Sequence, residues 1–71
     1  MSDRPVLRRA DKGPDVIELQ NLLGLTRSTL VGVGYFGSET ENAVKAFQKA
    51  HNLPETGVCD GESWAAIEGE A

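Results

Sequence analysis

A glycine-bounded corner that leads into a helix is the most informative part of this chain. It reads Gly34-Tyr35-Phe36-Gly37-Ser38-Glu39-Thr40-Glu41 and continues as Asn42-Ala43-Val44-Lys45-Ala46-Phe47-Gln48. Ser38 and Glu41 have the spacing of a capping box, in which the serine hydroxyl accepts from the third backbone N–H and the glutamate reaches back to the serine N–H. Apolar residues then recur at helical spacing on one face: Ala43, Val44, Phe47 and Ala50. We therefore predict a helix over about residues 38–52.

The segment upstream of the corner predicts another helix. Lys12-Gly13-Pro14-Asp15-Val16 is typical of a helix start. Proline at the first helical position loses no hydrogen bond, and an aspartate beside it lies at the positive end of the helix dipole. One apolar stripe follows at helical spacing: Val16, Leu19 and Leu23. These features predict a helix over about residues 14–24.

The second loop repeats the first corner. Gly57-Val58-Cys59-Asp60-Gly61-Glu62-Ser63 echoes residues 34–40, because both read as a glycine, two larger residues, a break and then a Ser or Thr at a helix start. A short third helix is predicted to follow, over about residues 61–68, with Trp64, Ala65 and Ile67 turned inward. We expect the two corners to share a geometry.

The length and composition allow one domain over residues 1–71, with its core over about residues 7–67. Cys59 is the only cysteine and His51 the only histidine, so the chain can form neither an intramolecular disulfide nor a Cys/His metal cage. We therefore expect no metal and no cofactor. The core must come from aliphatic residues together with three aromatic ones: Phe36, Phe47 and Trp64.

The charge and hydropathy of the chain bear on its partners. The formal net charge is −4, with the acidic excess in residues 38–71, and this argues against a nucleic-acid partner. No apolar run approaches the roughly 18–20 residues of a membrane span. No signal-peptide pattern follows Met1. We expect neither a nucleic acid nor a membrane as partner, and we expect no export signal of the ordinary secretory route in these residues.

The order and spacing of these pieces resemble the peptidoglycan-binding domain family, small three-helix modules attached to cell-wall hydrolases of bacteria and their phages. The resemblance covers residues 7–67 in six pieces: Leu7-Arg8-Arg9, Gly13-Pro14-Asp15-Val16-Ile17-Glu18-Leu19-Gln20, residues 34–48, Leu53-Pro54, Thr56-Gly57 and Ser63-Trp64-Ala65-Ala66-Ile67. Val33 and Thr56 stand where the family often has an aspartate before the corner glycine, and the loop over residues 25–33 is unlike the family's usual short turn. These departures bear on the ligand more than on the fold, because binding residues concentrate in loops.

The resemblance implies a fold and a function. The fold is all-α, a compact three-helix peptidoglycan-binding-domain-like fold with two glycine-containing loops. The function is non-catalytic binding of peptidoglycan, through its glycan strand or its stem peptide, which anchors or targets a covalently linked hydrolase or an envelope protein. We expect a monomer that acts in the bacterial cell envelope, in the periplasm or cell wall, or is delivered there by a phage.

The candidate ligand-binding residues are those near the first corner whose chemistry suits peptidoglycan. Its sugars and acetamido groups call for hydrogen-bonding side chains and a flat aromatic, and the carboxylates of its stem peptides call for a basic residue. Four residues meet these needs: Tyr35, Thr40, Gln48 and Arg27. For Tyr35, ordinary half-buried packing is the alternative. Gln48, like Gln20, could instead bond the loop backbone.

Catalysis is not expected. His51 falls at a helix end, where a cation interacts well with the dipole. Cys59 is expected to pack inertly in a loop. The carboxylate pairs Glu39 with Glu41 and Asp60 with Glu62 lie at helix starts, where acidic residues serve as caps. We therefore predict no catalytic residue.

An alternative function on the same fold is a protein–protein interaction module, in a phage or envelope assembly, or a pro-segment. Metalloproteinase pro-domains resemble this fold and use a cysteine to ligate the zinc of their enzyme. Cys59 lies in Gly57-Val58-Cys59-Asp60, which lacks the Arg-Cys-Gly motif of those pro-domains. The altered first loop keeps a plain interaction role open.

Overall fold

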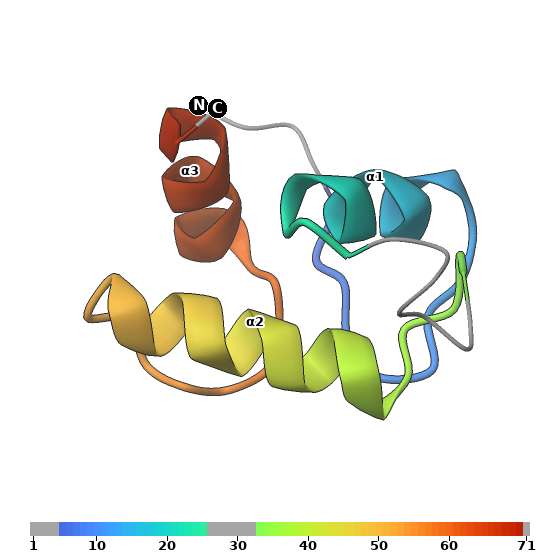
Figure 1. The fold of residues 1–71 in the computed structure, drawn as a ribbon, viewed down its shortest axis with the longest axis horizontal. Helices are drawn as coiled ribbons and strands as arrows, with labels where there is room; N and C mark the ends of the chain where they lie inside the picture. Colours follow the sequence, from blue (N-terminus) through green and yellow to red (C-terminus); the bar gives the residue numbers. More distant parts are fainter. Residues whose placement is uncertain (1–4, 26–32, 71) are drawn as a thin grey trace.

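Three helices make up most of residues 5–25 and 33–70, the parts of the chain that the computed structural model describes (Figure 1). They are α1 (Pro14–Leu22), α2 (Ser38–Ala50) and α3 (Gly61–Glu70). In Figure 1, α2 runs along one side of the molecule and α1 and α3 both lie on the other side of it. The described residues hold no strand, only two isolated antiparallel bridges. The expectation of an all-α, three-helix fold is confirmed.

The three helix starts were predicted correctly, but the cap predicted for α2 was not. Each helix begins at the residue that the sequence predicts, and each ends within two residues of the predicted end. The prediction of a capping box from Ser38 and Glu41 at the start of α2 is wrong, however. The N-cap is Gly37, whose carbonyl accepts from Glu41 N at 3.0 Å, and no side chain caps the helix. Ser38 already has helical backbone angles, so its hydroxyl does not stand where an N-cap side chain would. The Glu41 carboxylate instead meets Arg9 Nη1 at 3.3 Å.

The start of α3 carries a side-chain cap. Asp60 Oδ1 accepts from Ser63 N at 3.1 Å, and the first helical bond runs from Trp64 N to Asp60 O at 2.9 Å. The aspartate thereby satisfies one of the backbone N–H groups that have no partner within the first turn of a helix.

Removing this cap gives a first testable prediction. Asp60→Ala is expected to lower the free energy of unfolding by about 1 kcal/mol, the usual cost of losing an N-cap. Ser38→Ala is the matched control, and it should change the unfolding free energy by less than about 0.5 kcal/mol because Ser38 caps nothing. Urea denaturation followed by Trp64 fluorescence measures both. Equal losses in the two variants would show that Ser38 caps α2 in solution.

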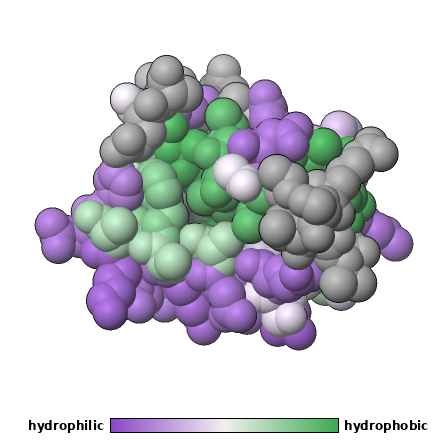
Figure 2. All heavy atoms as spheres, in the orientation of Figure 1, coloured by the Kyte–Doolittle hydropathy of each residue, from purple (hydrophilic) through white to green (hydrophobic). Residues whose placement is uncertain are grey.

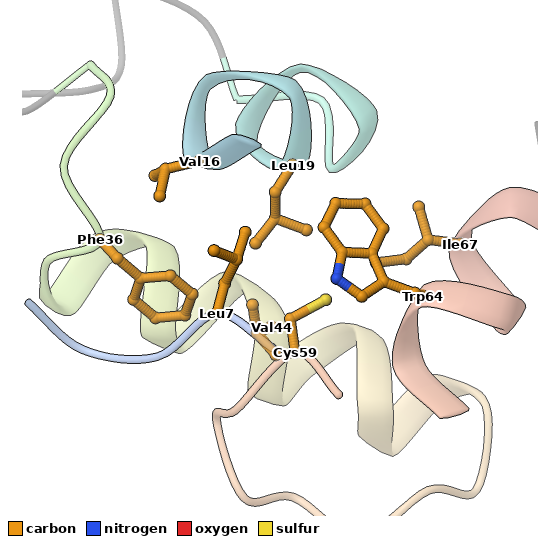
Figure 3. Packing of buried hydrophobic residues seen from close by; sticks show 8 residues of the cluster. All are labelled: Leu7, Val16, Leu19, Phe36, Val44, Cys59, Trp64 and Ile67. Carbon is orange, nitrogen blue, oxygen red and sulfur yellow. The ribbon is translucent and has the colours of Figure 1, made fainter. Parts of the chain in front are cut away.

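The core gathers side chains from all three helices and from the segments between them. Its buried members are Leu7, Val16, Leu19, Phe36, Val44, Cys59, Trp64 and Ile67 (Figure 3). In Figure 3, Leu19 on α1 points toward the ring of Trp64 on α3, so the core closes between these two helices. Leu23 and Phe47 pack against the cluster without being fully buried.

The surface shows where the core ends. In Figure 2, apolar side chains gather over the middle of one face, and hydrophilic ones line its lower edge. The expectation that Ala65 is turned inward is wrong, because Ala65 is exposed, and Ala50 at the end of the apolar face of α2 is exposed as well. Ala50 lies in the last turn of α2, which extends past α3 in Figure 1.

The segment before α1 forms backbone hydrogen bonds with both corners. Leu7 and Cys59 exchange two backbone hydrogen bonds, Leu7 N to Cys59 O at 3.1 Å and Cys59 N to Leu7 O at 2.8 Å. Farther along, Ala10 N donates to Phe36 O at 2.9 Å, and Phe36 N donates to Asp11 O at 2.8 Å. Trp64 Nε1 completes the attachment by donating to the carbonyl of Pro5 at 2.9 Å. These contacts hold the corners in fixed positions beside the helices.

Candidate functional site

The first corner, residues 34–40, is built around the buried side chain of Gln20 on α1. Gln20 Nε2 donates to Tyr35 O at 3.0 Å and to Thr40 Oγ1 at 2.9 Å. Gly34 N donates to Gln20 Oε1 at 2.8 Å. Gly34 has φ of +83°, a left-handed conformation that glycine adopts without strain. One amide group therefore supports both ends of the corner.

The second corner, residues 57–63, has the same construction around Gln48 on α2. Gln48 Nε2 donates to Val58 O at 2.9 Å and to Ser63 Oγ at 3.0 Å, and Gly57 N donates to Gln48 Oε1 at 3.0 Å. Gly57 has φ of +76°. The prediction that the two corners share a geometry is confirmed, and the shared element is a buried glutamine one helix earlier.

The two units differ in the length of the loop that precedes the corner. Both helices end alike, with Leu25 N donating to Gln20 O at 2.9 Å and Leu53 N donating to Gln48 O at 2.8 Å. The glutamine and the corner glycine are 14 residues apart in the first unit and 9 in the second. The added length precedes the first corner.

Two of the four predicted ligand-binding residues lie in the interior. Thr40 and Gln48 are each 1% exposed; the Thr40 hydroxyl accepts from the Gln20 amide, and the Gln48 amide is bonded to the second corner. This corrects the expectation of direct ligand contact for both, because a surface ligand cannot reach them in this structure. The alternative, that Gln48 and Gln20 bond loop backbone, is confirmed. Arg27 lies outside the described residues.

Tyr35 is the predicted site residue that the structure places at the surface. Its side chain is 45% exposed, although its neighbour Phe36 is buried in the core. The ring rests on the first corner, since a Cβ atom at Gly37 would lie 3.3 Å from Tyr35 Cε2. The Tyr35 backbone is also held by the Gln20 amide. The ring is thus attached to a rigid support and exposed to solvent.

Two exposed aliphatic side chains at the first corner were not among the predicted site residues. Ile17 and Val33 are both exposed, and Ile17 packs against the first corner, because a Cβ atom at Gly34 would lie 3.2 Å from Ile17 Cγ1. The signal for Ile17 was its place outside the buried stripe of its helix. We call Ile17, Val33 and Tyr35 the corner patch.

The titratable side chains that could suggest catalysis occupy structural positions: a helix end, the core and the first turns of helices. His51, at the C-cap of α2, stacks on Phe47 with ring centroids 4.1 Å apart. Cys59 is 0% exposed and belongs to the core. Glu39, Glu41 and Glu62 lie in the first turns of helices. Among residues 5–25 and 33–70, no group of three His, Cys, Asp or Glu side chains is placed to hold a metal ion, and none of the helices there has the length and hydropathy to cross a membrane.

The known proteins to which the chain is similar identify its family. A family model described as "Putative peptidoglycan binding domain" matches residues 12–67. The chain belongs to this family. The match includes both corners and the glutamines that support them, so the geometry described above is the geometry of a peptidoglycan-binding domain.

Solved structures of similar proteins share the fold of this peptidoglycan-binding domain. The endolysin of the Burkholderia phage AP3 is 33% identical, with a TM-score of 0.82 over 94% of this chain. A peptidoglycan-binding protein from Clostridioides difficile, in complex with glutamine hydroxamate, is 31% identical, with a TM-score of 0.80 over 94% of this chain. The N-terminal domain of SleB is 30% identical, with a TM-score of 0.82 over 99% of this chain.

The lengths of these proteins differ from that of the present chain. The matched part is 26% of the endolysin chain, 42% of the Clostridioides difficile chain and 97% of the SleB N-terminal domain. The chain therefore spans about a quarter of the endolysin, and the same fold forms one part of that longer protein.

Proposed function

We propose that this domain is a non-catalytic module that binds peptidoglycan through the first corner and holds an attached protein on the bacterial cell wall. The observation that carries the proposal is the exposed Tyr35 ring on a corner held by Gln20. Membership of the peptidoglycan-binding family supports the choice of ligand.

The first corner suits binding because its contact surface is already ordered. The Tyr35 ring rests on the Gly37 backbone, and the Gln20 amide holds the Tyr35 carbonyl and the Gly34 N–H. A ligand that covers the ring has little conformational entropy to remove from it, since the support is fixed beforehand. An aromatic side chain of this kind offers a large apolar face together with a polar hydroxyl.

The absence of catalysis is also part of the proposal. His51 is stacked on Phe47, Cys59 is inside the core, and Asp60 serves as the cap of α3. A nucleophile needs an oriented base within hydrogen-bond reach. Each of these groups instead has a role in holding the fold, which supports binding as the whole activity of the domain.

The attached protein in this proposal is a hydrolase or an envelope protein, and the domain acts as a monomer in the cell wall or at a wall reached by a phage. The endolysin supports this arrangement, because its chain is much longer than the part that matches. Tethering raises the effective concentration of an enzyme at its substrate even where one module binds weakly.

Cys59 does not support the alternative that the chain is a pro-segment. A cysteine that ligates the metal of another protein must reach that protein's surface. The Cys59 side chain is 0% exposed, and its backbone is paired with Leu7.

A sedimentation assay tests the proposal. The purified domain is mixed with insoluble, protein-free sacculi, and pellet and supernatant are compared, with cellulose and chitin as control polymers. The domain is expected to pellet with sacculi and to remain in solution with cellulose. Tyr35→Ala should weaken the binding about tenfold or more, because it removes the aromatic face. Leu22→Ala, a change at another exposed apolar side chain, should leave the binding unchanged.

Two results would count against the proposal. If the folded domain stays in the supernatant with sacculi at about 100 μM, it does not bind the wall with useful affinity. If Tyr35→Ala pellets as well as the original chain, the binding surface lies elsewhere than at the first corner.

A further inference from the structure

A lysine that the sequence analysis did not select lies directly opposite Tyr35. Lys12 and Tyr35 form an antiparallel bridge. The flanking hydrogen bonds run from Gly13 N to Gly34 O at 3.0 Å and from Phe36 N to Asp11 O at 2.8 Å. This is the pattern of a non-hydrogen-bonded pair, in which the two opposed side chains leave the backbone on the same side and lie closer than in the other kind of pair.

The ammonium group of Lys12 is available to a ligand. Lys12 is exposed, and so is its neighbour across the bridge, Tyr35. Within residues 5–25 and 33–70 the recorded ion pair joins Arg9 to Glu41 and does not involve Lys12. The adjacent carboxylate, Asp11, accepts from Arg8 N at 2.9 Å.

Because the net charge of the chain is negative, the Lys12 ammonium matters for the binding of an anion. The formal net charge of −4 does not attract an anion at long range. An anionic ligand would therefore depend on a nearby cation, and an ammonium group donates charge-assisted hydrogen bonds to carboxylates.

Two exposed side chains at the first corner are aliphatic. Ile17 and Val33, the aliphatic members of the corner patch, carry no hydrogen-bonding group in their side chains. A sugar ring presents hydroxyl and acetamido groups around its rim and loses hydrogen bonds with water when it covers such side chains. A short peptide with small apolar side chains and a free carboxylate loses less and gains the ammonium contact.

We propose that Lys12 and the corner patch bind the stem peptide of peptidoglycan, with the Lys12 ammonium holding a free carboxylate and the patch covering the peptide's small apolar side chains. The inference rests on the proposed function and narrows it from peptidoglycan to the peptide part. A carboxylate is also present on the lactyl group of glycan strands from which the peptides have been removed. The test must therefore separate the two sources.

The test is a titration of the domain with four soluble probes, followed by backbone amide chemical shifts. The probes are a synthetic stem tetrapeptide, the same peptide with its carboxylates amidated, a glycan oligosaccharide without stem peptides, and an uncharged chitin oligosaccharide. We expect the free-acid peptide to bind and to shift the amides of the first corner. The amidated peptide should bind about tenfold or more weakly, since the contact between charged groups is lost.

Variants of matched charge assign the contact to Lys12. Lys12→Gln should weaken binding of the free-acid peptide about tenfold, while Lys12→Arg should retain most of it. Lys49→Gln removes one positive charge from an exposed position at the end of α2 and should leave binding unchanged. A thermal unfolding curve for each variant verifies that the fold is retained.

Three other outcomes would contradict the inference, and each has a different meaning. Binding of the peptide-free glycan, weakened by Lys12→Gln, would assign Lys12 to the lactyl carboxylate. Binding of the chitin oligosaccharide, unaffected by Lys12→Gln, would assign the corner to the sugars and leave the proposed function standing. If the domain fails to bind all four probes and also fails to pellet with sacculi, the proposed function falls together with the inference.

Discussion

Replacing Gln48 with leucine is expected to lower the free energy of unfolding by about 3–4 kcal/mol. The change removes the donor to Val58 O and Ser63 Oγ and the acceptor of Gly57 N, and it leaves these groups without the amide that joined them. A buried polar group that loses its partner costs about 1–3 kcal/mol, and leucine can make none of the lost bonds. A domain of this length has a total unfolding free energy of about 4–10 kcal/mol, so the variant should lose a large part of its stability.

Urea denaturation followed by Trp64 fluorescence measures this loss, because Trp64 is buried in the core. Lys49→Leu is the control, since it introduces the same side chain at the next position on α2, which is exposed. It should change the unfolding free energy by less than about 0.5 kcal/mol. A loss below about 1 kcal/mol for Gln48→Leu would mean that the second corner holds its shape without the glutamine.

Gly57→Ala is expected to lower the free energy of unfolding by about 2–3 kcal/mol. The φ of +76° costs an alanine about 1–2 kcal/mol. In addition, its Cβ would lie 2.8 Å from Glu41 Cγ and 3.0 Å from Lys45 Cε, so these α2 side chains or the corner must move. Movement of the corner would also lengthen the bond from Gly57 N to Gln48 Oε1.

Two other glycines separate the steric part of this loss from the backbone part. Gly24 has φ of +79° but no atom within 4 Å of an added Cβ, so Gly24→Ala should show only the cost of about 1–2 kcal/mol for the backbone conformation. Gly61, at the start of α3, has neither a positive φ nor a close neighbour, and Gly61→Ala should be neutral or slightly stabilising. Thermal melts of the three variants rank them. Equal losses for Gly57→Ala and Gly24→Ala would show that α2 yields to the added methyl group at no cost.

These two predictions concern the second corner, whereas Tyr35 and Lys12 concern the first. The hydrogen bonds of Gln48 and Gln20 go to separate corners. A variant of Gly57 that remains folded should therefore still bind peptidoglycan. The sedimentation assay described above can measure this.

The local pattern of residues determined the helices and most of the core. Pro14 with Asp15, and the cap at Asp60, are signals read within one turn of a helix, and for that reason the predicted starts of α1 and α3 were correct. The burial of Val16, Leu19 and Trp64 also followed from periodicity, because the apolar face of a short helix has to be covered. The likeness between residues 34–40 and 57–63 predicted two equivalent corners before any contact was known.

Only the tertiary structure decided which polar residues face a ligand. Thr40 and Gln48 have the chemistry of ligand contacts, yet both are buried. The Gln48 amide is needed inside to satisfy the backbone of the second corner, and the Thr40 hydroxyl accepts from the Gln20 amide that does the same for the first. Ser38 with Glu41 matched a capping box, but Gly37 occupies the cap and Arg9, 32 residues away in the chain, takes the Glu41 carboxylate. Lys12 came to lie beside Tyr35 through a bridge between distant segments. Local sequence patterns carry little information about such pairings, because the pairing depends on how the whole chain packs.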